Sequence, residues 1–172
     1  GKVVVNLATK VSNSDEVHIG KKTIREDKNK ISTVIVYNKP KGEIVSKKDP
    51  QGRRTIYDSL DHKYKHFLSV GRLDYASEGL LLLSDSVEIV DALMHSDLER
   101  VYKIKVNGVI TKPVEQAMQN GLEIEDATGG AFKTSKIKSM SFAPFLAYDI
   151  LTNSEKFSKI KVVISEGKNR EL

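Results

Sequence analysis

The sequence contains no cysteine in its 172 residues and no long run of apolar residues. Without cysteine there can be no disulfide, no thiolate nucleophile and no zinc site built on thiolates. A membrane-spanning helix needs about 20 consecutive apolar residues, and no stretch approaches that length. The first residues also lack the pattern of a secretory signal peptide. We therefore expect no membrane partner and a cytoplasmic location.

Motifs for nucleotide cofactors and for hydrolytic triads are missing as well. The sequence has no Walker-type loop, no dinucleotide fingerprint and no Ser-His-Asp set, and the Gly129-Gly130 pair is not followed by a predicted helix. His62 and His66 stand four residues apart, but their surroundings are basic and no third ligand of matching type is near. We expect neither a cofactor nor a metal.

Positive charge is present in excess and is unevenly distributed. The length fits one domain, alone or with a small appendage, and the net charge of +5 favours a polyanionic partner. Between residues 39 and 54 two acids, Glu43 and Asp49, face six bases: Lys39, Lys41, Lys47, Lys48, Arg53 and Arg54. A flexible basic loop commonly contacts phosphates, although such a segment can also be a merely solvated loop.

The spacing of apolar residues predicts several strands interrupted by a few helices. We expect short strands within residues 1–24, a polar linker at 26–30, and then strands over residues 31–37, 80–83, 101–107, 122–125, 131–140, 145–151 and 159–164. Residues 67–70 lead into the stretch that begins at Gly71. Helices are expected over residues 55–60, from a cap at Ser84 or Asp85 to residue 94, and over residues 111–120. This order predicts an α+β domain with a mainly antiparallel sheet.

Residues 71–83, GRLDYASEGLLLL, combine a polar turn with an apolar strand. Arg72 and Asp74 lie on the turn, and the four leucines after Gly79 predict a strand buried on both faces. A carboxylate on a turn anchored by a buried strand is a suitable place for chemistry, because the backbone cannot drift. Asp74 could also be an ordinary turn residue whose side chain accepts a backbone hydrogen bond.

The segment 101–107 alternates between apolar and basic residues. Tyr102 lies on one face with Ile104 and Val106, and Lys103 and Lys105 lie on the other. Tyr102 is therefore expected to point toward the core.

Together with three further segments, the GRLD stretch closely resembles the ribosomal RNA pseudouridine synthases. The segments are NKPKG at 38–42 with its continuation DPQGRRTIYD at 49–58, RVYKI at 100–104, and EGKNREL at 166–172. In this order they are most similar to the family that joins a catalytic domain to a small RNA-binding domain of the ribosomal-protein S-four type. GEIVSKKDPQGR, AFKT and EGKNREL are most like its large-subunit rRNA branch.

The resemblance implies an α+β catalytic core around a long mixed sheet, an RNA-binding cleft across it, and no cofactor or metal. By position, Asp74 corresponds to the catalytic aspartate, Tyr102 to the tyrosine that packs against the target base, and Leu172 to an apolar residue of the same pocket. Further substrate contacts are expected at Arg72, Asn38, Lys39, Lys41, Arg53, Arg54, Lys168, Asn169 and Arg170.

The same resemblance implies two domains. Residues 1–28 are expected to form the later, truncated part of the S-four-type domain, with VVVN answering to the family's VxVNG and Leu7 in place of the glycine. Residues 31–172 are expected to form the catalytic domain without its C-terminal end. The family motif continues past Leu172 with a basic residue that pairs with the catalytic aspartate. We expect a monomer.

Two classes of function follow. One is an isomerase that converts a uridine in a stem-loop of large-subunit rRNA, or alternatively of small-subunit rRNA, with Asp74 attacking either the sugar carbon 1′ or the ring carbon 6. The other is a non-catalytic RNA-binding or ribosome-assembly module. An isolated carboxylate facing a polyanion favours the enzyme, because a mere binder gains nothing from a group that repels phosphate.

Overall fold

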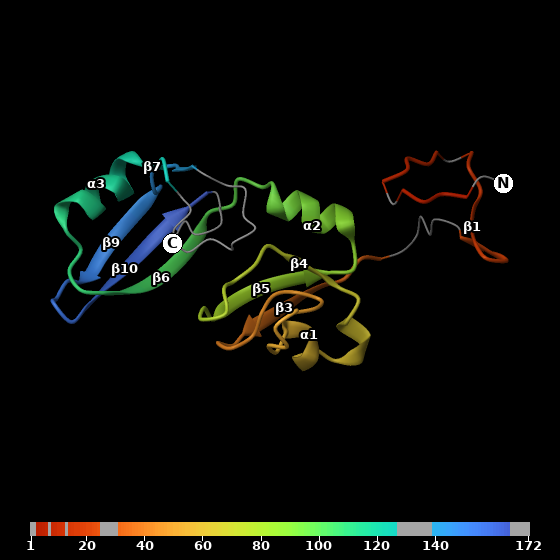
Figure 1. The fold of residues 1–172 in the computed structure, drawn as a ribbon, viewed down its shortest axis with the longest axis horizontal. Helices are drawn as coiled ribbons and strands as arrows, with labels where there is room; N and C mark the ends of the chain where they lie inside the picture. Colours follow the sequence, from red (N-terminus) through yellow and green to blue (C-terminus); the bar gives the residue numbers. More distant parts are fainter. Residues whose placement is uncertain (1–2, 7, 13, 25–30, 127–138, 166–172) are drawn as a thin grey trace. The chain divides into compact units, whose positions relative to one another are not determined.

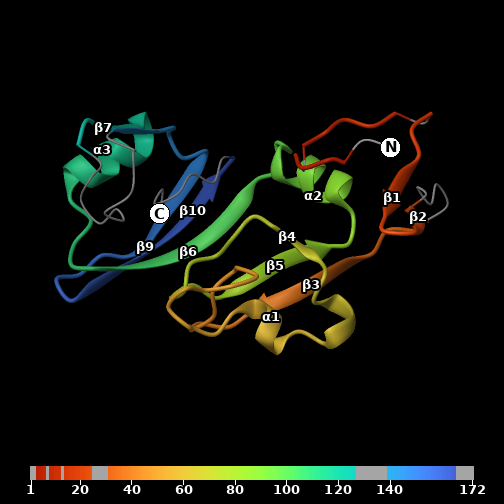
Figure 2. The ribbon, with the colours of Figure 1, turned by 45° about the vertical axis from the view of Figure 1, so that its right-hand side comes forward.

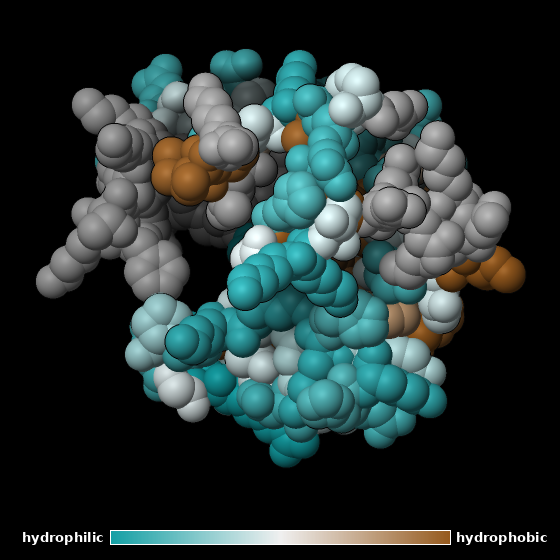
Figure 3. All heavy atoms as spheres, turned by 90° about the vertical axis from the view of Figure 1, so that its right-hand side faces the viewer, coloured by the Kyte–Doolittle hydropathy of each residue, from teal (hydrophilic) through white to brown (hydrophobic). Residues whose placement is uncertain are grey.

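The structure is a computed structural model that describes residues 3–6, 8–12, 14–24, 31–126 and 139–165. The chain divides into two compact units, Gly1–Thr33 and Val34–Leu172 (Figure 1). Within the described ranges, no helix is long and apolar enough to cross a membrane. Hydrophilic side chains prevail on the face drawn in Figure 3, where hydrophobic residues form small separate patches.

The first unit contains one small hairpin. Strands β1 (Val17–Ile19) and β2 (Lys22–Ile24) pair in antiparallel fashion. Residues 3–6 form no strand, and none of the described residues of this unit is buried. Apolar residues of this unit do not face a core, since Val3, Val5 and Ile19 are 84%, 92% and 70% exposed. Two strands of three residues bury too little area to form a core by themselves.

The second unit begins with a three-stranded antiparallel sheet in the order β3–β5–β4. Its strands are β3 (Val34–Lys39), β5 (Gly79–Ser84) and β4 (Leu68–Val70). The first and last residues of the β3–β5 ladder pair Val34 with Ser84 and Lys39 with Gly79. The end of β3 therefore lies directly beside the GRLD turn that precedes β5 (Figure 2).

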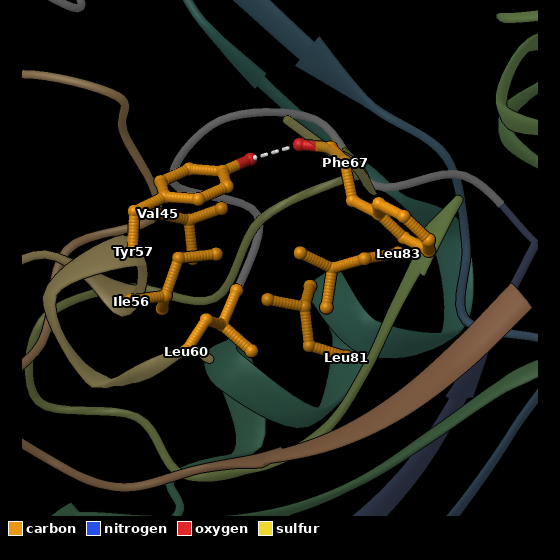
Figure 4. Packing of buried hydrophobic residues seen from close by; sticks show 7 residues of the cluster. All are labelled: Val45, Ile56, Tyr57, Leu60, Phe67, Leu81 and Leu83. Carbon is orange, nitrogen blue, oxygen red and sulfur yellow. Dashed lines mark hydrogen bonds between the residues drawn. The ribbon is translucent and has the colours of Figure 1, made fainter. Parts of the chain in front are cut away.

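One face of this sheet covers the first hydrophobic core. Leu81 and Leu83 of β5 pack there with α1 (Ile56–Ser59) and its neighbours; Figure 4 shows Val45, Ile56, Tyr57, Leu60, Phe67, Leu81 and Leu83. The prediction of a strand buried on both faces is wrong, because Leu80 is 67% exposed. Four leucines in a row suit a parallel strand, but in this antiparallel sheet alternate side chains point away from the core.

Local capping signals explain the helices. The carboxylate of Asp58 accepts hydrogen bonds from the backbone N–H and the hydroxyl of Thr55 at the start of α1. Helix α2 (Val87–Met94) contacts β4 and β5 and is capped by Ser86, one or two residues after the predicted Ser84 or Asp85. Helix α3 (Lys112–Asn120) begins one residue after its predicted start and ends as predicted, with Gly121 at φ +83° just after it.

A second three-stranded antiparallel sheet has the order β6–β10–β9. It contains β6 (Arg100–Asn107), β10 (Phe157–Ile164) and β9 (Ala147–Thr152). Its core face packs Ile160 and Val162 with Ile110 and with Met118 of α3. Strands β7 (Leu122–Ile124) and β8 (Met140–Phe142) form a separate pair.

The α+β prediction is confirmed, and every pair of strands in the described part of the chain is antiparallel. The described strands form four short sheets where the resemblance implied one long mixed sheet. Of the strand predicted over residues 131–140, residues 131–138 lie outside the described residues.

Candidate active site

The predicted catalytic carboxylate, Asp74, lies on the turn between β4 and β5 and is exposed. The turn is closed by a hydrogen bond from the Ser77 N–H to the Asp74 carbonyl oxygen at 3.0 Å. The N–H of Gly42 donates to the carbonyl oxygen of Tyr75 at 2.8 Å, which joins the NKPKG turn to the GRLD turn. Two segments that the sequence singled out separately are thus held side by side.

The buried side chain of Lys39 holds the same turn in place. This side chain is fully buried, and its Nζ donates to the carbonyl oxygens of Pro40, Asp74 and Ser77 at 3.0, 3.0 and 2.7 Å. Burial lowers the pKa of Lys39, while the carboxylates of Glu43 and Asp74 oppose that shift. The backbone on both sides of Tyr75 and Ala76 is therefore tied to one ammonium group.

The expected RNA contact at Lys39 is accordingly corrected. A fully buried ammonium group with three carbonyl partners is not exposed to a phosphate, so Lys39 positions the turn instead. The sequence did carry a signal for this placement. Ile35, Tyr37 and Lys39 alternate along β3 with exposed residues, which puts Lys39 on the core face of the strand.

The basic segment 39–54 is held in place by contacts of its cations and is not a flexible loop. Lys47 Nζ donates to the carbonyl oxygens of Lys65 and Phe67 at 2.5 and 2.7 Å and lies 3.7 Å from the centroid of the Tyr57 ring. Burial lowers the pKa of Lys47. Its ammonium group, like that of Lys39, is occupied by the protein itself.

Arg53 is paired within the same segment. Its guanidinium donates to both carboxylate oxygens of Asp49 at 2.9 Å, and its backbone N–H donates at 2.8 Å. The hydrogen bonds from the Arg53 side chain are the largest cause that lowers the pKa of Asp49 to about 2. The Arg53 side chain remains 39% exposed, so its predicted RNA contact stays a prediction.

Glu43 is a buried carboxylate that sequence reasoning missed. It accepts hydrogen bonds from the hydroxyls of Tyr37, at 2.6 Å, and Ser59, and it pairs with Arg54 Nε at 3.3 Å. Burial, together with Glu43, raises the pKa of Tyr37. Arg54 also donates to Ser59 Oγ. This cluster joins β3, the basic segment and α1. In the sequence, the only indication of it was the presence of an acidic residue, Glu43, within a basic segment.

The other predicted contacts lie on several elements of the second unit. Asn38 and Arg72 are exposed, and Lys41 lies 3.5 Å from Glu78 with both side chains exposed to solvent. Tyr102 is half-buried in β6 and packs against the second core, on the face that its alternation predicted. The remaining predicted contacts lie outside the described residues: Lys168, Asn169, Arg170 and Leu172.

The histidine pair shows no ligand geometry. His62 belongs to a short 3-10 helix (His62–Tyr64). The ring of His66 packs edge-on against the ring of Phe67, with 4.9 Å between the two ring centroids. Over the described ranges, no group of three or more His, Cys, Asp or Glu residues could hold a metal ion. The chemistry that the site offers is that of an exposed carboxylate on a fixed turn.

Comparison with known proteins identifies the family of the chain. The model of the RNA pseudouridylate synthase family matches residues 33–172. An uncharacterized RNA pseudouridine synthase of Helicobacter pylori is 55% identical over 177 residues, which cover 100% of this chain and 68% of that protein. A ribosomal large subunit pseudouridine synthase B of Bacillus subtilis is 31% identical, and the match covers 100% of this chain and 65% of that protein.

A solved structure described as a pseudouridylate synthase shares the fold. It superposes with a TM-score of 0.64 and 21% identity, covering 99% of this chain and 66% of that one. The chain thus spans about two thirds of the length of these relatives. The family match over residues 33–172, which include the turn of Asp74, shows that the chain belongs to the RNA pseudouridylate synthase family, isomerases that convert uridine in RNA to pseudouridine.

Proposed function

We propose that this protein isomerises a specific uridine of ribosomal RNA, in a stem-loop of the large-subunit rRNA, with Asp74 as the nucleophile. The observation that carries the proposal is the exposed Asp74 on a turn whose backbone is fixed by Lys39 and Gly42. Relatives named large-subunit pseudouridine synthases, at 31% and 33% identity, support the choice of RNA.

The reaction requires a nucleophile and no redox partner. The bond between N1 of the uracil and carbon 1′ of the ribose breaks, the uracil turns, and its carbon 5 joins carbon 1′. The proton on carbon 5 leaves and N1 takes up a proton, so the product is an isomer of the substrate. An ionised Asp74 would attack carbon 1′ or the ring carbon 6. Because the Asp74 backbone is anchored, its carboxylate would meet the reacting carbon without having to order a loop first.

The uridine has to leave its helix or loop before Asp74 can reach it. Flipping a nucleotide out costs a few kcal/mol, and stacking on an aromatic side chain returns about 1–3 kcal/mol. We assign the stacking to Tyr102, whose ring is half-buried and held by the second core. A ring held in this way loses little conformational freedom on binding.

Contacts to the RNA backbone are assigned to the exposed polar side chains around the turn. Arg72, Asn38 and Lys41 are exposed, and Arg53 and Arg54 present part of their guanidinium groups to solvent. Lys168, Asn169, Arg170 and Leu172 are included in the proposal on sequence grounds alone. Residues 1–28 are proposed to belong to an S-four-type RNA-binding domain.

The test replaces the nucleophile in the complete protein. Cells that lack the gene are complemented with the wild type or with Asp74→Asn, and pseudouridine is mapped chemically along both ribosomal RNAs. We expect one large-subunit position to be modified only with the wild type, while purified Asp74→Asn still binds rRNA. Asp97→Asn, which alters an exposed aspartate of the second unit, is the matched control and should restore modification.

Two results would contradict the proposal. If Asp74→Asn restores every pseudouridine, the carboxylate is not the nucleophile. If the gene's loss removes none, the protein is an RNA-binding module rather than an rRNA-modifying enzyme. A lost position in the small-subunit rRNA would correct the substrate and leave the chemistry standing.

A further inference from the structure

Four lysines gather on one face of the second sheet. In the β6–β10 ladder, Lys103 lies directly opposite Lys161, and Lys105 lies directly opposite Lys159. The alternate residues of the same strands turn to the core, where Ile160 and Val162 are buried. The four lysines therefore share the face that points away from the core, and we call them the lysine face.

This arrangement works against the stability of the sheet. Like charges directly opposite each other on neighbouring antiparallel strands repel, whereas opposite charges would attract. The only acid in the ladder positions next to these lysines is Asp149 of β9, opposite Lys161. Among the residues that the structure describes, no carboxylate oxygen lies within 4.0 Å of any of the four ammonium groups. An external anion would relieve the repulsion.

Part of the lysine face is hollowed and has apolar side chains beside it. A shallow groove of about 220 Å³ is lined by Lys103, Ile104, Lys105, Leu151 and Lys159. Phe157 lies beside it, with Lys105 Nζ at 4.6 Å and Lys159 Nζ at 5.7 Å from its ring centroid. Exposed ammonium groups around an apolar floor suit a strand of RNA, because phosphates and ribose or base surfaces then both find partners.

We propose that the lysine face binds the phosphodiester backbone of the RNA substrate, at a segment away from the uridine that reacts at Asp74. The proposal rests on the proposed function, because the substrate class is taken from it. Charge complementarity selects the occupant, since RNA supplies phosphates at regular intervals along one chain. An acidic protein partner would use the same charges without the counterion release that RNA binding shows.

The test counts phosphate contacts through their salt dependence. The complete protein is prepared as wild type and as two double variants, Lys103→Gln with Lys161→Gln and Lys105→Gln with Lys159→Gln. Lys65→Gln with Lys112→Gln, two exposed lysines elsewhere in the second unit, is the control with the same loss of charge. Affinity for a transcript of the large-subunit rRNA is measured at several salt concentrations, and thermal unfolding verifies that each variant is folded.

Each double variant should lower the slope of log affinity against log salt by about 1.4–1.8, which corresponds to two lost phosphate contacts. The control should keep the wild-type slope. If both double variants keep that slope as well, the lysine face does not bind RNA and the inference is overturned. If they keep the slope but lose affinity for poly-glutamate, the occupant is an acidic protein, which also overturns it.

Pseudouridine formation by the wild type, measured on the same transcript, separates this inference from the proposed function. If the wild type forms pseudouridine and the lysine variants bind RNA as the wild type does, only the inference about the lysine face is wrong. If the wild type forms no pseudouridine but the salt slope falls in the lysine variants, the lysine face is an RNA site and the proposed reaction is wrong.

Discussion

The basic segment 39–54 and the lysine face use positive charge in opposite ways. In the basic segment, Lys39, Lys47, Arg53 and Arg54 are bound by carbonyl oxygens, by hydroxyls or by carboxylates of the protein itself. On the lysine face, like charges are paired across two strands. Local composition favours the basic segment as the RNA-binding region, whereas the contacts favour the lysine face.

The difference shows that a count of basic residues does not locate an anion-binding surface. A cation contributes less to binding where its hydrogen-bond donors already have protein partners, because a bonded donor must first lose its partner. Lys39 has three carbonyl partners and no exposed surface. Exposed lysines that repel one another have both a free donor and a reason to accept an anion.

Lys39→Met is the strongest way to test the comparison, because it removes a cation that the fold uses. Three carbonyl oxygens, on Pro40, Asp74 and Ser77, would lose a charged donor. We expect the free energy of unfolding in urea to fall by about 2–4 kcal/mol. The turnover of RNA that is already bound should fall as well, because the Asp74 turn is no longer fixed.

Lys41→Met is the matched control for stability, since Lys41 is two residues away and exposed. It should change the unfolding free energy by less than about 0.5 kcal/mol. If Lys39→Met is as stable as Lys41→Met, the two lysines are equivalent and the comparison fails. Single-turnover rates at saturating protein separate a loosened turn, which slows the reaction, from a lost RNA contact, which weakens binding only.

Local patterns in the sequence were sufficient for most of the elements. Pro113 and Gly121 mark both ends of α3 because capping depends on residues within one turn of the helix. Alternation was sufficient to place Tyr102 on the core face of β6. These features depend on near neighbours, which a sequence displays directly.

What the sequence could not show depends on distant neighbours. The carbonyl oxygens around Lys39 belong in part to residues 35 and 38 positions further along the chain. Leu80 is exposed because β5 pairs with β3 and β4 in an antiparallel sheet, which no run of leucines reveals. The lysine face depends on the register of β6 with β10, since Lys103 and Lys161 are far apart in sequence.

Asp49→Asn tests the comparison by removing the carboxylate that pairs with Arg53 in the basic segment. The pKa of Asp49 is about 2 in the folded protein against an ordinary value of 3.8. Because the folded pKa is the lower one, the pair with Arg53 stabilises the protein above pH 3.8, and this contribution disappears as the pH falls through about 2. Asp49→Asn should therefore lose stability at neutral pH and show a flatter decline between these two pH values.

Urea unfolding measured across this acid range would show the change. Asp97→Asn, at an exposed aspartate outside the basic segment, is the control and should keep the wild-type decline. A decline in Asp49→Asn as steep as that of the wild type would mean that Arg53 is not held by Asp49. Arg53 would then be an available cation, and the two regions would differ less than the structure indicates.

Lys103→Glu probes the other side of the comparison and should have the smallest effect on stability. It converts a like-charge pair with Lys161 into an opposite-charge pair, which should raise the free energy of unfolding by about 0.2–1 kcal/mol. Affinity for the rRNA transcript should fall at the same time, because one cation becomes an anion. Lys103→Gln should give an intermediate result in both measurements.

Replacing a cation that the fold uses, such as Lys39, should lower the free energy of unfolding. Changes of opposite sign in the free energy of unfolding for Lys39→Met and Lys103→Glu would therefore distinguish the two regions. A loss of stability in Lys103→Glu would show that the lysine face contributes to folding after all.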